Sequence, residues 1–182
     1  MLTVCFEPFP ILKTSRLVLR RISADDVECV FRMRSDPQMM KYVPRPLVTS
    51  RHEALNHIRQ IEKKIAENDG INWAITQKET DVMIGIIGLY VIKKEHYRAE
   101  LGYMILPEFH GKGIMSEAIE GVLKYGFENM KLHSIEAIID PDNIASEKVL
   151  LNNGFIKEAH LRENEFWNGK FIDTVIYSKL HP

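Results

Sequence analysis

The chain has 182 residues, of which 45% are hydrophobic and 27% are charged. This balance is typical of a folded globular protein and excludes a largely disordered one, and the length predicts a single domain over residues 1–182. Lys and Arg total 24 against 25 Asp and Glu, and the resulting formal net charge of -1 gives no general attraction to nucleic acid or to anionic membranes.

The cysteines and the first residues indicate a reduced compartment. Cys5 and Cys29 have the spacing of neither a disulfide framework nor a metal site. The N-terminal segment lacks the basic leader and long apolar stretch of a signal peptide, and the longest apolar run, Val82–Ile92, is about half the length of a membrane-spanning helix. We therefore expect a cytoplasmic protein that does not bind a membrane. No metal site is predicted, because the remaining candidates lack helical or strand spacing with carboxylates: His96, His110 and His133.

The N-terminal half predicts one strand, two helices and an antiparallel meander. Ser23 precedes two acidic residues, which is typical of a helix start, and Thr49 or Ser50 can cap the second helix. From Ile71 the hydrophobic period changes to two. The expected ranges are a strand over 16–22, helices over 23–35 and from 49 or 50 to about 67, and strands over 71–75, 82–92 and 97–106.

The C-terminal half predicts two helices and three strands. Apolar residues repeat at helical spacing after Gly113, and Asn168-Gly169 is a strong hairpin-turn signal. The expected ranges are helices over 114–130 and 143–152, and strands over 135–139, 155–165 and 171–179. Strand–helix–strand units mixed with hairpins predict an α/β (α+β) fold, with a mixed, mostly antiparallel twisted sheet of six to seven strands and helices on both faces.

Residues 101–115 carry the most informative motif. A predicted strand leads into a loop with Gly111 and Gly113, and an amphipathic helix starts at once. The N–H groups at a helix start suit a phosphate, although a tight strand-to-helix turn also favours glycine. The Walker loop does not fit, because its spacing is absent. The dinucleotide fingerprint does not fit either, because Ser116 stands where it has a third glycine.

The run from Ile105 through Glu117 resembles the acyl-CoA motif of the GNAT N-acetyltransferases. Asn143, Ser146 and Gly154-Phe155 are similar to the family's later Asn-x-x-Ser…Gly-Phe helix, and residues 14–20 resemble the opening strand of the ribosomal-protein N-terminal acetyltransferases. The resemblance implies a GNAT-like fold and an acetyl-CoA (coenzyme A) donor. The residues that it assigns to this cofactor are Met104, Ile105, Leu106, His110, Gly111, Lys112, Gly113, Ile114, Met115, Ser116, Asn143 and Ser146.

Two positions depart from the family pattern. Glu108 stands where the motif often has Gln or Arg, and we expect its carboxylate to face solvent or Lys112. Leu150 occupies the position of the tyrosine that protonates the leaving thiolate in many members. The resemblance offers Ser146 for that role. Judged from the residues alone, Asn143 is the N-cap of its helix and Ser146 a solvent-facing helical residue.

The catalytic base has two candidates. Glu165 matches the general-base position of the ribosomal-protein branch, and its aromatic neighbours Phe166 and Trp167 could raise its pKa. The alternative for Glu165 is an exposed hairpin residue without a catalytic role. Glu100 is the rival, at the start of the strand that leads into the glycine loop; the alternative for Glu100 is an ion pair with Arg98 or Lys94. Because an amine can attack a thioester directly, no covalent enzyme intermediate is needed.

The acceptor is expected to be an amine. The ribosomal-protein branch favours a protein N-terminus, whereas small amines such as polyamines, aminoglycosides or amino-acid-like molecules fit the same chemistry, and a non-catalytic acyl-CoA-binding module is a further alternative. The loop over residues 36–48, with Tyr42 and Arg45, is expected to shape the acceptor side. The chain is predicted to be a monomer, or a homodimer formed by an edge strand.

Overall fold

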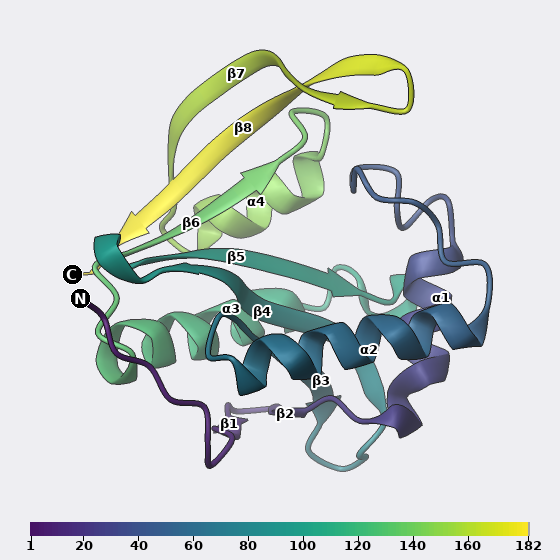
Figure 1. Ribbon diagram of the computed structural model, residues 1–182, viewed down its shortest axis with the longest axis vertical. Helices are drawn as coiled ribbons and strands as arrows, with labels where there is room; N and C mark the ends of the chain where they lie inside the picture. The colour runs from purple at the N-terminus through teal and green to yellow at the C-terminus, as the bar shows by residue number, and fades with distance from the viewer. Residues whose placement is uncertain (182) are drawn as a thin grey trace.

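The computed structural model describes residues 1–181 and contains one eight-stranded sheet in the order β1-β2-β3-β4-β5-β6-β8-β7 (Figure 1). All neighbouring strands are antiparallel except β5 and β6. The strands are β1 (Leu12–Lys13), β2 (Leu17–Arg21), β3 (Ile71–Gln77), β4 (Met83–Lys93), β5 (Arg98–Ile105), β6 (Ser134–Ile139), β7 (Ile156–Trp167) and β8 (Lys170–Leu180). The predicted mixed sheet is confirmed. The predicted strand number is too low, because β1 has only two residues and therefore no periodicity.

Helices cover both faces of the sheet, as predicted. Figure 1 shows α2 in front of the sheet and α3 behind it. The helices are α1 (Val27–Ser35), α2 (Arg51–Ala66), α3 (Ile114–Lys124) and α4 (Ile144–Asn152). Trp73, Ala74 and Ile75 are consecutive on β3 and are all fully buried. Because successive strand residues point to opposite faces, both faces of the central strands are covered.

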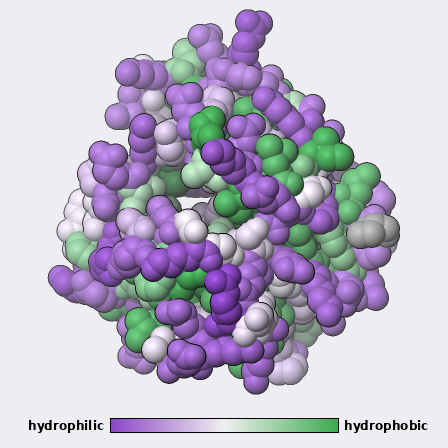
Figure 2. All heavy atoms as spheres, turned by 180° about the vertical axis from the view of Figure 1, so that it is seen from behind, coloured by the Kyte–Doolittle hydropathy of each residue, from purple (hydrophilic) through white to green (hydrophobic). Residues whose placement is uncertain are grey.

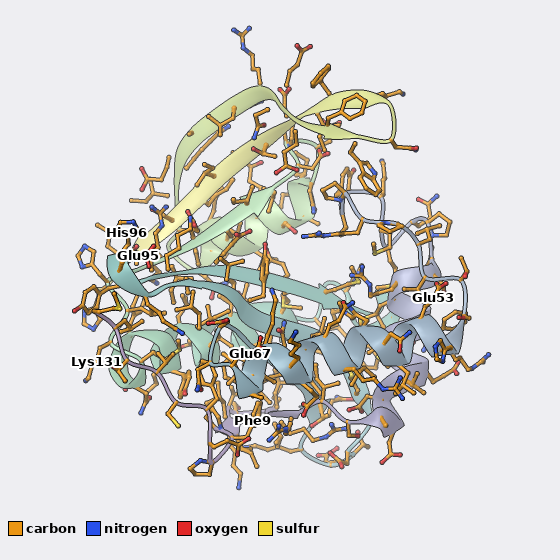
Figure 3. All side chains as sticks on the ribbon, in the orientation of Figure 1. Phe9, Glu53, Glu67, Glu95, His96 and Lys131 are labelled. Carbon is orange, nitrogen blue, oxygen red and sulfur yellow. The ribbon has the colours of Figure 1, made fainter. Side chains whose placement is uncertain are left out.

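The first two helices start at the predicted caps. Ser23 forms a capping box with Asp26 around a single 3-10 turn that leads into α1. The Ser50 hydroxyl accepts a hydrogen bond from the Glu53 N–H at the start of α2. Figure 3 shows Glu53 near the first turn of α2 and Glu67 just after its last turn, so that α2 runs across one face of the sheet.

The third helix is shorter than predicted. It ends at Lys124, and a π-helical turn over Tyr125–Asn129 follows in place of continued α-helix. A Cβ on Gly126 would lie 2.8 Å from the Ile135 Cδ1 atom, so glycine lets this turn approach β6 closely. Tyr125 packs edge-on against the buried Trp73, with ring centroids 5.6 Å apart. The turn therefore fixes the C-terminal end of α3 to the sheet.

Candidate functional site

The sheet opens between β5 and β6. These strands pair only at Arg98↔Ser134, Ala99↔Ile135 and Glu100↔Glu136, although β5 continues to Ile105 and β6 to Ile139. Figure 1 shows the two strands diverging, and Figure 3 shows Glu95 and His96 in the turn at the end where they are paired. The view from behind shows the surface hollowed near the middle of the molecule (Figure 2). Beyond Glu100, the β6-facing edge of β5 has no strand partner.

Helix α3 starts just after β5 ends, and its first turn has no side-chain cap. Gly111 and Gly113 both have φ of 71°, in the left-handed region that favours glycine. Within residues 1–181, the backbone N–H groups of residues 111–116 have no hydrogen-bond acceptor. By contrast, Ser50 caps α2 and Asn143 caps α4. Consecutive unpaired N–H groups at the positive end of a helix form a site for an anion such as a phosphate.

Neighbouring side chains hold this loop in place. The His110 Nε2 atom lies 3.0 Å from the Ile105 carbonyl oxygen, and the His110 N–H donates to the Pro107 carbonyl. His110 therefore fastens the loop and offers no free backbone N–H. Both backbone groups of Leu106 are also bonded within the protein, to Ile84 and Phe109, so Leu106 can only shape a cofactor site.

Arg16 was not predicted as a site residue, yet it lies beside the start of α3. Its Nη1 atom donates to the Lys112 carbonyl at 3.0 Å, and its Nε atom pairs with the Glu117 carboxylate at 2.6 Å. Thr14 and the Arg16 backbone N–H also donate to Glu117. Arg16 therefore places a positive charge next to the unpaired N–H groups. The signal for Arg16 in the sequence is the motif at residues 14–20, which contains it.

Glu108 is exposed, which agrees with the expectation that it faces solvent, and it has an ion-pair partner that was not predicted. Its carboxylate pairs with Arg32 at 2.8 Å, and about half of its side chain is exposed. Lys112 does not reach Glu108; its Nζ atom lies 5.4 Å from the centroid of the Phe109 ring. The α1 arginine therefore neutralises the acidic residue near the loop.

The start of α4 brings Asn143, Ser146 and Tyr103 together. The Asn143 Oδ1 atom accepts a hydrogen bond from the Ser146 N–H at 3.1 Å, which makes Asn143 the helix N-cap. The Tyr103 hydroxyl, from β5, donates to the Ser146 carbonyl at 3.4 Å, and burial raises the pKa of Tyr103 to about 12. Leu150 is fully buried. Tyr103 was not predicted as a site residue, because its hydroxyl reaches α4 only in the folded protein.

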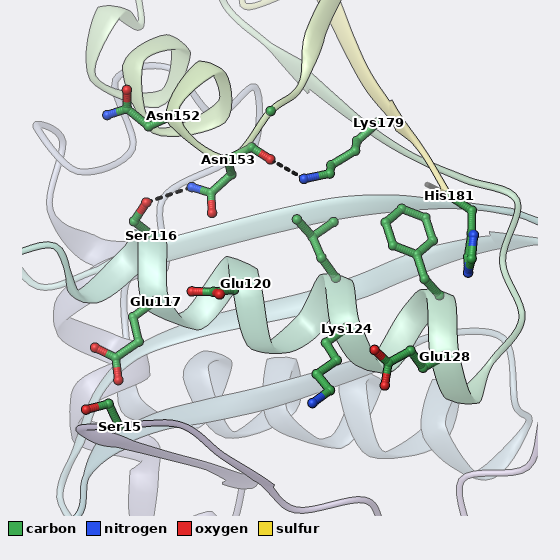
Figure 4. Close-up of a pocket in the computed structure, with 13 residues that line it drawn as sticks. Ser15, Ser116, Glu117, Glu120, Lys124, Glu128, Asn152, Asn153, Lys179 and His181 are labelled. Carbon is green, nitrogen blue, oxygen red and sulfur yellow. Dashed lines mark hydrogen bonds between the residues drawn. The ribbon is translucent and has the colours of Figure 1, made fainter.

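A groove runs along α3, between this helix and the chain segment after α4 (Figure 4). The Asn153 side chain donates to the Ser116 hydroxyl at 2.7 Å, and the Lys179 Nζ atom donates to the Asn153 carbonyl at 2.6 Å. The groove starts at the first turn of α3, beside the unpaired N–H groups. Its polar lining includes Ser116, Glu120, Lys124, Asn153 and Lys179.

Glu100 lies at the last position where β5 pairs with β6, and the two strands diverge after it. It accepts a short hydrogen bond from the hydroxyl of Tyr90, the extra residue of a β-bulge in β4. Burial raises the pKa of Glu100, although the Tyr90 hydrogen bond opposes this shift. The expected pairs with Arg98 and Lys94 are not formed. Arg98 and Lys93 instead pair with the buried Glu136 on β6, and Lys94 pairs with Asp69.

Glu165 lies near the tip of the β7–β8 hairpin and is exposed. Its charge contributes to the raised pKa of Glu100, so the two candidate bases face the same region. Phe166 and Phe171 are largely exposed beside it, with ring centroids 5.1 Å apart. The hairpin therefore presents aromatic surface next to the opening in the sheet.

Residues 16–156 match the family described as the acetyltransferase (GNAT) domain. The uncharacterized N-acetyltransferase YoaA of Bacillus subtilis (strain 168) is 38% identical over 174 residues, which cover 96% of this chain and 98% of that protein. The chain belongs to the GNAT acetyltransferase family.

Two further relatives have named acceptors. The ribosomal-protein-serine acetyltransferase of Escherichia coli (strain K12) is 31% identical over 100 residues, which cover 55% of this chain and 56% of that protein. The structure of spermidine N-acetyltransferase from Vibrio cholerae, in complex with CoA and spermine, has a TM-score of 0.81 and 26% identity, covering 92% of this chain and 96% of that one. This GNAT protein is therefore an enzyme that uses acetyl-CoA to acetylate an amine.

The described residues fit acetyl-CoA chemically. The uncapped start of α3 offers N–H donors for a pyrophosphate, and the diverging edge of β5 offers backbone groups for an amide-containing arm. In residues 1–181, no three His, Cys, Asp or Glu side chains are grouped to hold a metal ion. Likewise, none of the described helices is both long and apolar enough to span a membrane.

Proposed function

We propose that this GNAT enzyme acetylates the N-terminal amine of a peptide or protein, with residues 1–182 acting as one catalytic unit. The observation that carries the donor side of the proposal is the uncapped start of α3, close to the opening between β5 and β6. The exposed Phe166 and Phe171 on the hairpin favour a peptide over a small polar amine, because they offer apolar surface to neighbouring side chains. The similarity to the ribosomal-protein-serine acetyltransferase supports the same acceptor.

The donor side is assigned to backbone groups. The N–H groups of residues 111–116 would hold the pyrophosphate of coenzyme A, with Arg16 adding positive charge. Met104 and Ile105 on β5, and Asn143 and Ser146 on α4, would contact the pantetheine arm. The groove beside Ser116 and Asn153 would take the nucleotide end. Bound acetyl-CoA supplies an acetyl thioester that an amine attacks directly.

We assign the proton-accepting role to Glu100. Its pKa is raised by burial, which suits a base that must accept a proton from an ammonium ion near neutral pH. Tyr90 orients the carboxylate through its hydroxyl. Glu165, exposed on the hairpin, is the alternative base, and exchanging each carboxylate for its amide separates the two.

Hydroxyl groups at the start of α4 are assigned to the departing thiolate. Ser146 is half-buried beside the opening, and the Tyr103 hydroxyl lies against its carbonyl. Together they would supply the hydrogen bond that the family's tyrosine gives elsewhere, since Leu150 has no hydroxyl. This scheme assigns no role to the Cys29 thiol, whose pKa is raised by burial to about 12.

A small amine is the second candidate acceptor. The solved relative with CoA and spermine supports it, and Glu100 and Glu165 together could attract an ammonium group. An acceptor screen that measures free thiol released from acetyl-CoA separates the two candidates. Peptides starting with Ser, Ala or Met are expected to be better acceptors than spermidine, spermine and free amino acids. Turnover of spermidine without any peptide turnover would contradict the proposal.

A further inference from the structure

Arg34, at the end of α1, carries a positive charge without a partner. It makes no ion pair and no side-chain hydrogen bond with any described residue, and its Nε atom is buried without an acceptor. Other inward-facing arginines have carboxylate partners: Arg20 pairs with Asp26, and Arg98 pairs with Glu136. A partly buried guanidinium cannot lose its proton, so leaving it unpaired costs free energy.

Two further basic groups surround Arg34. Arg45 lies in the loop between α1 and α2, and the loop returns to Arg34 through a hydrogen bond from the Val48 N–H to the Arg34 carbonyl. Arg45 lowers the pKa of Arg34, after burial. His57 on α2 is half-buried, and burial followed by the charges of Arg34, Arg45 and Lys64 lowers its pKa to about 4. His57 is therefore neutral at pH 7 and can hydrogen-bond an anion without adding charge.

This cationic group lies beside the proposed catalytic carboxylate. Lys64 donates to the Tyr90 carbonyl at 3.1 Å, and the charge of Arg45 opposes the rise in the Tyr90 pKa that burial and Glu100 cause. The Tyr90 hydroxyl is in turn bonded to Glu100. The charge of Arg45 therefore acts on Tyr90 as well as on Arg34 and His57, which places the cationic side chains on the Tyr90 side of Glu100.

We propose that Arg34, Arg45 and His57 bind a carboxylate that the acceptor carries close to its amine. This inference rests on the proposed function and narrows the acceptor class to amines with a neighbouring negative charge. The carboxylate supplies the counter-charge that Arg34 lacks within the protein. A polyamine places a second ammonium group there, where the positive charges of Arg34, Arg45 and Lys64 repel it.

The test compares acceptors that differ in one charge. Thiol release is measured for the peptides Ser-Glu-Gly-Gly and Ser-Gln-Gly-Gly, and for free serine against serinamide, so that a peptide side chain and a free α-carboxylate are assessed separately. We expect the acid member of at least one pair to have a kcat/KM higher by about tenfold or more, because a hydrogen bond between two charged groups is stronger than one between neutral groups. Equal values in both pairs overturn the inference.

Arg34→Gln should reduce that preference to within about twofold, and Arg34→Lys should retain part of it, because a charge without the planar fork remains. The control is Arg59→Gln, since Arg59 is exposed on α2 and bonds only Asn56, and it should leave the preference unchanged. Arg34→Met should not lower the melting temperature, because it removes an unpaired charge. An unchanged preference in folded Arg34→Gln overturns the inference.

A binding measurement separates this inference from the proposed function. Ser-Glu-Gly-Gly and Ser-Gln-Gly-Gly are titrated calorimetrically into the enzyme in the presence of CoA, which requires no turnover. Tighter binding of the acid peptide, lost in Arg34→Gln, supports the anion site even if no thiol is released. If both peptides are acetylated and bind equally, the proposed function stands and the anion site is overturned.

Discussion

At the scale of single residues, the proposed mechanism depends on the pH at which the Glu100 carboxyl loses its proton. A base works only as the carboxylate, so activity should fall as pH drops through its pKa, which burial raises above the ordinary value of 4.5. Tyr90→Phe removes the hydrogen bond that lowers this pKa, so the acidic limb of the kcat/KM profile should move to higher pH. A limb that stays in place or moves lower would show that Glu100 is not the titrating base.

Replacing the carboxylate itself gives a larger effect. Glu100→Gln should lower kcat by about 100- to 10,000-fold, the usual contribution of a general base, with a small effect on the KM for acetyl-CoA. Glu165→Gln is the matched comparison and should retain most activity. If Glu165→Gln loses this activity and Glu100→Gln retains it, the base is Glu165 on the hairpin.

A substitution at Gly111 tests the proposed phosphate site through a single backbone φ angle. Gly111→Ala forces an alanine to φ of 71°, which costs about 1–2 kcal/mol, and relaxation of this strain should misalign the N–H groups and raise the KM for acetyl-CoA. Gly169→Ala is the control, because Gly169 also has a positive φ and open space around its Cβ position but lies in the hairpin turn. Equal effects of both variants on this KM would contradict the assignment.

At the scale of elements, Glu117 joins α3 to the segment before β2. Burial raises the pKa of Glu117, but hydrogen bonds from Thr14 and Arg16 outweigh it and the net shift is downward. A depressed carboxylate pKa stabilises the fold above its unfolded value of about 4.5, and this contribution is lost as pH falls through the folded value. Glu117→Gln should therefore lower the melting temperature at pH 7, and the difference from the parent should shrink below pH 4.5.

The same variant should also weaken donor binding, because Arg16 loses the carboxylate that fixes it beside Lys112. Glu79→Gln is the control, since Glu79 is exposed in the turn between β3 and β4, away from the groove, and makes no ion pair with a described residue. Calorimetric titration with CoA measures donor binding for the two variants. A constant difference in melting temperature from pH 7 to pH 3 would contradict the role of the ionised carboxylate.

Most elements followed from local sequence, and the exceptions have physical causes. Ser23, Ser50 and Asn143 cap helices where their hydrogen-bonding side chains predict. The π-helical turn after Lys124 could not be predicted from apolar spacing, because that spacing continues through it. The hydrogen-bond partner of Glu100 could not be predicted either, because Tyr90 contacts Glu100 through a bulge in the neighbouring strand.

At the scale of the whole molecule, the proposed function depends on the opening that forms where β5 and β6 stop pairing. Hydrophobic patterning predicted the strands, but not that β5 and β6 pair over three positions and then diverge. β8 lies between β6 and β7, so the last hairpin, with its aromatic tip, extends the sheet on the β6 side of the opening. The acyl-CoA loop was recognisable because its glycines are local. Arg34 and Arg45 meet His57 only after α1 and α2 pack.

The most direct test of the central claim is mass spectrometry of a Ser-initiated peptide that also contains an internal lysine, after incubation with the enzyme and acetyl-CoA. We expect one added acetyl group, located on the α-amine, and at least about 100-fold less product from Glu100→Gln at early times under the same conditions. An unmodified peptide in a reaction that acetylates spermidine, or an acetyl group found only on the lysine side chain, would contradict it.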